Sequence, residues 1–81
     1  MHEFALIQDL IEKTLAEMQA KGANKVTLIE LGVGDSSGYS SESLKLAFEL
    51  LVADTDFKDT ELVLKNVEGR EVLIKRLVME Q

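Results

Sequence analysis

The residues best suited to chemistry lie at the amino terminus, in the triplet Met1-His2-Glu3. The amine of Met1, the main-chain nitrogens of His2 and Glu3, and the imidazole of His2 are separated by only a few bonds. Together they can close small chelate rings and supply four nitrogens in one plane. This geometry suits Ni(II) or Cu(II), whose d electrons favour tetragonal coordination, whereas Zn(II) has no such preference. The triplet therefore predicts a binding site for a late first-row metal ion.

The predicted site depends on an unblocked first amine. Protons compete with a metal ion for its nitrogen ligands, so metal affinity should fall on acidification. The bulky His2 disfavours removal of the initiator methionine, whereas an N-terminal tag would destroy the site. A lone histidine at a terminus is more often simply solvated, and a solvated His2 is the alternative interpretation.

Other groups of reactive side chains fit known sites less well. Asp54, Asp56 and Asp59 resemble a cation-binding loop but lack the glycine and the closing glutamate of an EF-hand, which favours a solvated loop. The glycines and serines of residues 32–38 lack the lysine of a phosphate-binding loop, which favours a turn. The serines have no base other than the terminal His2, so we expect no enzyme activity.

The composition narrows the class of protein further. The 81 residues suffice for one compact domain, residues 1–81. Nine Lys plus Arg against fifteen Asp plus Glu give a net charge of −6, which argues against nucleic acid and against an anionic membrane as partners. The chain has no cysteine, so disulfides and thiolate metal ligands are excluded. Because neither a signal peptide nor a membrane span is apparent, the expected location is the cytoplasm.

The first half of the sequence predicts the elements that would position the triplet. A helix is expected from Phe4 to Lys21, ended by Gly22 in a left-handed conformation. Its apolar positions recur at helical spacing, at Ile7, Leu10, Ile11, Leu15 and Met18. A strand is expected over residues 25–33, in the middle of a sheet because both of its faces carry apolar side chains.

The second half predicts one more helix and two more strands. Ser40 is a natural N-cap for a helix from Ser41 to Ala53, in which Phe48 is expected to be buried. Two strands, Glu61 to Val67 and Arg70 to Met79, are expected to form an antiparallel hairpin around Glu68-Gly69.

These elements predict an α+β fold. It is a two-layer sandwich in which two helices cover one face of a three-stranded mixed sheet, in the order α-β-α-β-β. The less covered face, or an exposed sheet edge, would then be free to bind a partner or a second copy of the chain.

Several segments of the sequence resemble the HypA family of nickel metallochaperones, which act in the maturation of NiFe-hydrogenase and urease. The similarity lies in the opening triplet, Gly22-Ala23, the loop of residues 33–38 and the helical run of residues 44–49. The resemblance implies that Met1, His2 and Glu3 bind Ni(II), with the Glu3 carboxylate tuning the metal or handing it on. The partners that it implies are the nickel-insertion GTPase and the hydrogenase large-subunit precursor, and in some organisms the urease maturation proteins.

The sequence departs from the family pattern in one place. HypA proteins carry a zinc-binding insert with two CxxC pairs between their last two strands, where this chain has only residues 66–70. No zinc is therefore expected, and contacts made by the insert would be missing. The chain is either a natural short paralogue or an engineered nickel domain. The alternative function is a HypA-like interaction module that has lost zinc binding and metal delivery.

Overall fold

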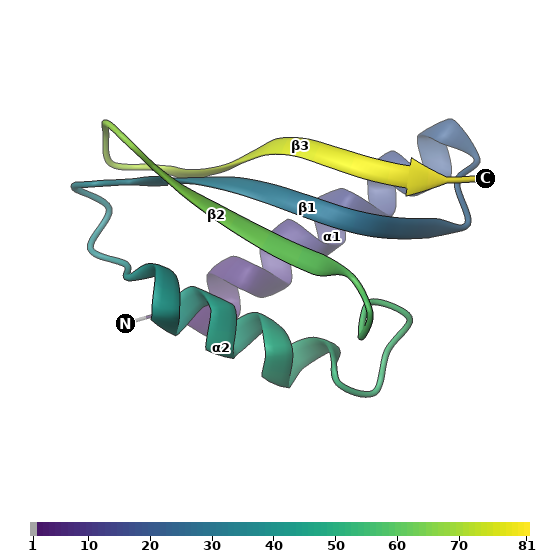
Figure 1. Ribbon diagram of the computed structural model, residues 1–81, viewed down its shortest axis with the longest axis horizontal. Coiled ribbons are helices and arrows are strands. Elements are labelled where there is room, and N and C mark those ends of the chain that lie inside the picture. Colours follow the sequence, from purple (N-terminus) through teal and green to yellow (C-terminus); the bar gives the residue numbers. More distant parts are fainter. Residues whose placement is uncertain (1) are drawn as a thin grey trace.

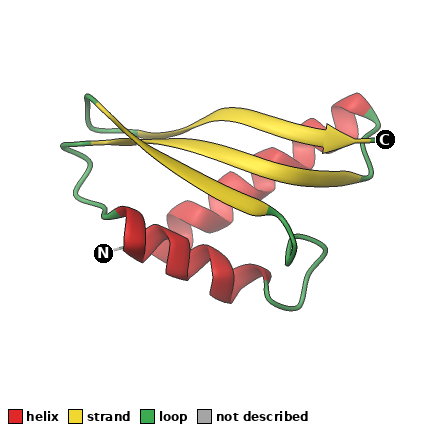
Figure 2. Cartoon of the chain, viewed as in Figure 1, coloured by secondary structure: helices red, strands yellow, loops and turns green. Residues whose placement is uncertain are grey.

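The computed structural model describes residues 2–81 and consists of two layers. The elements follow one another as α1 (Glu3–Lys21), β1 (Lys25–Gly34), α2 (Ser41–Val52), β2 (Glu61–Val67) and β3 (Val72–Glu80). Both helices lie on the same side of the three-stranded sheet (Figures 1 and 2). The predicted α+β fold is confirmed. No helix in residues 2–81 combines the length and the apolar character that crossing a membrane requires.

The core lies between the helices and the sheet. Leu44 and Phe48 of α2 are 0% and 4% exposed, which confirms the prediction for Phe48. The inward side chains of the middle strand meet them at Ile29 and Leu31. From α1, the buried residues are Ile7, Leu10, Ile11 and Thr14.

Local capping signals place the helix ends where the sequence predicts them. Gly22 ends α1 at a φ of 64°, a conformation that costs glycine little. Ser40 begins α2, and its hydroxyl accepts a hydrogen bond from the Ser43 N–H. One position on α1 was predicted wrongly: Leu15 is 44% exposed, and Thr14 is buried in its place. Thr14 can be buried because its hydroxyl donates to the Leu10 carbonyl at 2.9 Å.

The predicted hairpin of the last two strands is wrong. The sheet order is β2-β1-β3, so β1 separates the two strands that the sequence predicts to be neighbours. β1 pairs in parallel with β2 and antiparallel with β3. The connection, residues 68–71, crosses the end of β1 and must span two strand spacings, about 10 Å, which a two-residue turn cannot do. The chain that joins the outer strands is nonetheless short, as the sequence indicates.

Gly34, the last residue of β1, allows this crossing. The crossing segment is tied down by hydrogen bonds from the Gly34 N–H to the Glu71 carbonyl and from the Ser36 N–H to the Gly69 carbonyl, both 2.8 Å long. A Cβ on Gly34 would overlap the Gly69 carbonyl oxygen and lie 2.8 Å from the Glu71 oxygen. Only a residue without a side chain therefore fits under the crossing.

We predict that Gly34→Ala destabilises the chain by about 2–3 kcal/mol, because two backbone segments would have to separate. Gly32→Ala is the matched control on the same strand. Its Cβ would meet mainly the flexible stem of Lys75 at 3.2 Å, so we expect a loss below about 1 kcal/mol. Urea unfolding of both variants measures the difference, and equal losses would contradict this account of the crossing.

A charged cluster occupies the sheet face opposite the helices. Glu30 of β1 lies between Lys65 of β2 and Arg76 of β3, at N···O distances of 3.5 and 3.3 Å. The Glu30 side chain is only 13% exposed. This burial raises its pKa, but the hydrogen bond from Arg76 and the positive charges of Lys65 and Arg76 outweigh it, so the pKa of Glu30 is lowered.

The lowered pKa predicts a pH-dependent contribution to stability. The contribution is present above the ordinary pKa of 4.5 and is lost as the pH falls through the lower value of the folded state. We therefore expect Glu30→Gln to reduce stability at pH 7, and the difference from wild type to shrink as the pH falls towards 3. Urea unfolding across this range tests the prediction, with Glu61→Gln on the same face as the control. A difference that does not change with pH would contradict it.

Candidate metal centre

The first turn of α1 holds the part of the predicted metal site that the structure describes. α1 begins at Glu3, with His2 as its N-cap. The Leu6 N–H donates to the His2 carbonyl at 3.0 Å, which makes this the first hydrogen bond of the helix. The His2 side chain is exposed and makes no capping hydrogen bond. Met1, the third predicted ligand residue, lies outside the described residues.

The start of the helix leaves two main-chain nitrogens available. The first N–H groups of an α-helix have no acceptor within the helix, and the Glu3 N–H belongs to this set. The His2 N–H precedes the helix altogether. A metal ion can therefore replace the protons on these two nitrogens without breaking a helical hydrogen bond.

The backbone angle at His2 brings the same two nitrogens together. The torsion angle ψ of His2 measures the rotation about its Cα–C bond between the main-chain nitrogens of His2 and Glu3. Its value is 45°. The two nitrogens thus lie on the same side of that bond. A five-membered chelate ring requires this torsion near zero, so a modest rotation closes it. An extended residue would hold them on opposite sides.

The remaining polar clusters do not converge on a metal site. Among residues 2–81, no three His, Asp or Glu side chains are grouped so that they could hold an ion. Asp54, Asp56 and Asp59 are exposed in the connection that follows α2, in agreement with a solvated loop. Asp35 has a structural role, since its carboxylate accepts a hydrogen bond from the Gly69 N–H at 3.1 Å. The candidate metal centre at the first turn of α1 therefore rests on main-chain nitrogens and the His2 imidazole and not on a cluster of side chains.

Comparison with known proteins gives the family. The family model described as "Hydrogenase/urease nickel incorporation, metallochaperone, hypA" matches residues 1–77. The chain belongs to the HypA family. This description names a metallochaperone and not an enzyme, as the sequence predicted.

Two curated relatives show the extent of the match. The hydrogenase maturation factor HypA of Chlorobaculum parvum is 38% identical over 69 residues, which cover 85% of this chain and 61% of that protein. The protein of the same name from Caldanaerobacter subterraneus is 33% identical over 70 residues, covering 86% of this chain and 61% of the relative. The chain therefore spans about three-fifths of the length of these relatives.

Solved structures share the fold. The solution structure of the Ni metallochaperone HypA from Helicobacter pylori superposes with a TM-score of 0.75 at 18% identity, covering 99% of this chain and 97% of that one. A second solution structure of a HypA protein gives a TM-score of 0.62 at 17% identity, covering 100% of this chain and 93% of the other. At these identities the likeness concerns the fold alone.

Proposed function

We propose that this chain binds Ni(II) through the amine of Met1, the main-chain nitrogens of His2 and Glu3, and the imidazole of His2. The observation that carries the proposal is the start of α1 at Glu3. It leaves the main-chain N–H groups of His2 and Glu3 without acceptors in the helix. The ψ of 45° at His2 also places these two nitrogens on the same side of the His2 Cα–C bond. Membership of the HypA family supports nickel as the metal.

The bound ion would be cargo for the maturation of hydrogenase or urease. A planar set of amine, amide and imidazole nitrogens binds nickel tightly at neutral pH, yet each ligand can be released by taking up a proton. A partner that supplies competing ligands can then remove the ion stepwise. The partners expected for such a transfer are the nickel-insertion GTPase and the hydrogenase large-subunit precursor, with urease maturation proteins as further recipients.

The first test is a Ni(II) titration of the chain with Met1 as its free first residue. We expect stoichiometric binding and the absorption band of square-planar nickel. His2→Ala, and separately a two-residue extension before Met1, should each weaken binding by about a hundredfold or more, because the first removes the imidazole and the second converts the free amine into an amide. A band that persists unchanged in His2→Ala would refute the assignment.

A second test distinguishes coordination of nickel by the main-chain nitrogen of Glu3 from coordination by the Glu3 carboxylate. Proline is tolerated at the first position of a helix, so Glu3→Pro should keep α1 while removing the proton that nickel must displace. We expect Glu3→Pro to lose the square-planar band and Glu3→Ala to retain it. Circular dichroism verifies that α1 is intact in both variants. Loss of the band in Glu3→Ala alone would instead indicate coordination by the carboxylate.

A further inference from the structure

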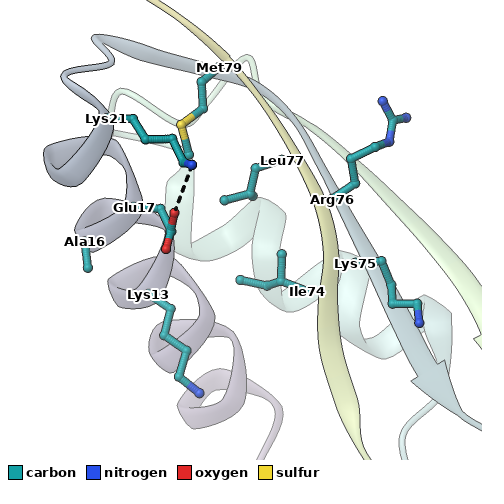
Figure 3. A pocket seen from close by; sticks show the side chains of 9 residues that line it. All are labelled: Lys13, Ala16, Glu17, Lys21, Ile74, Lys75, Arg76, Leu77 and Met79. Atoms are coloured by element: carbon teal, nitrogen blue, oxygen red, sulfur yellow. Dashed lines mark ion pairs between the residues drawn. The ribbon is translucent and has the colours of Figure 1, made fainter.

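A groove runs between the second half of α1 and the edge strand β3. Its volume is about 770 Å³, and its lining includes Lys13, Ala16 and Lys21 of α1. From β3, Ile74 and Leu77 point into the groove (Figure 3). These two side chains and the neighbouring Met79 are only partly buried, although they pack against the core. One side of the groove is thus apolar and incompletely covered.

The strand that borders the groove has a free edge. β3 pairs with β1 on one side, and it is the last strand of the described sheet on the other. It spans nine residues, so its outer edge offers an extended row of main-chain donors and acceptors. Such an edge accepts an added strand, in which alternate side chains fall on the two faces of the sheet.

Two cationic side chains, Lys75 and Arg76, lie on the other face of this strand, where Arg76 is paired with Glu30. The register of β3 against β1 passes from Arg76 opposite Glu30 to Ile74 opposite Leu31, which leaves Lys75 as an extra residue in a β-bulge. As a result, the side chains of Lys75 and Arg76 extend to the opposite side of β3 from Ile74 and Leu77, although both residues also contribute to the lining of the groove (Figure 3). Lys75 has no ion-pair partner among residues 2–81, although the chain as a whole carries a charge of −6.

The charges argue against a second copy as the occupant of this edge. Arg76 is the middle residue of β3. Two copies of β3 paired antiparallel over their full length would place Arg76 opposite Arg76, with Lys75 beside each, and like charges at opposed positions are destabilising. An acidic segment would form favourable cross-strand pairs at the same positions.

The other edge of the sheet is less suited to an added strand. β2 has seven residues, two fewer than β3. The pocket beside it, between β2 and α2, measures about 260 Å³, roughly a third of the volume of the groove. Lys65 of β2 is paired with Glu30, as is Arg76 of β3, so among residues 2–81 it is the unpaired cation Lys75 that distinguishes the β3 edge.

We propose that the outer edge of β3 binds an extended partner segment in which apolar and acidic side chains alternate. The apolar side chains enter the groove against Ile74 and Leu77, and the acidic ones meet Lys75 and Arg76 on the opposite face. This site is independent of the proposed nickel site. It borders the end of α1 at Lys21, about 27 Å along the helix from Glu3 at 1.5 Å per residue.

The test uses a blocked seven-residue peptide that alternates glutamate and valine and carries glutamate at both ends. It is titrated at pH 7 into the isotopically labelled chain and followed by NMR. We expect shifts of the amides of Val72–Glu80 and slower hydrogen exchange at its outer edge. A peptide with lysine in place of glutamate should bind at least fivefold more weakly, because it places like charges opposite Lys75 and Arg76.

Variants of the chain provide the matched controls. Lys75→Glu should weaken binding of the acidic peptide about fivefold or more, whereas Lys58→Glu, the same charge change near the start of β2, should leave it unchanged. His2→Ala should also bind the peptide normally, which separates this result from failure of the nickel site. The proposal is overturned if β3 does not respond at millimolar peptide, if β2 responds instead, if the two peptides bind equally, or if β3 self-associates.

Discussion

The burial of Ile7 is the contact on which the candidate metal site depends. Ile7 is 1% exposed and packs in the core shared by α1, α2 and the sheet, only four residues after the first residue of the helix. A helix this close to the chain terminus would otherwise fray, because its first turn is held by few hydrogen bonds. Burial of Ile7 fixes the first turn, and the bond from the Leu6 N–H to the His2 carbonyl extends that order to His2 and Glu3, the proposed ligand residues. The core thereby positions main-chain nitrogens that have no contact with it.

Local signals in the sequence predict the parts of the fold that local interactions decide. Gly22 and Ser40 end and begin helices through bonds within a few residues, so their roles are readable from the sequence. The proposed metal-binding triplet is equally local, since its nitrogens are joined by a few covalent bonds. The torsion at His2, in contrast, follows from where α1 begins in three dimensions, and no residue type specifies it.

Non-local features are where sequence reasoning fails. Glu68-Gly69 is a good turn signal, yet a turn sequence does not reveal whether a third strand lies between the two that it joins. The decisive residue is Gly34, over thirty positions earlier, which leaves space for the crossing. Leu15 is a similar case. Its spacing fits the apolar stripe, but the adjacent Thr14 satisfies its own hydroxyl within the helix and takes the buried position. The groove beside β3 has no sequence signal, because it forms only when α1 and β3 meet.

The connection between β2 and β3 is held in place by contacts within the chain itself. Residues 68–71 join β2 directly to β3. They are held by backbone hydrogen bonds to Gly34 and Ser36 and by a hydrogen bond to the Asp35 carboxylate. These contacts hold the exposed crossing segment against the end of β1. The hydrogen bonds at the crossing thus hold the end of β1, and the buried side chains of β1 pack in the same core as Ile7, which fixes the first turn of α1.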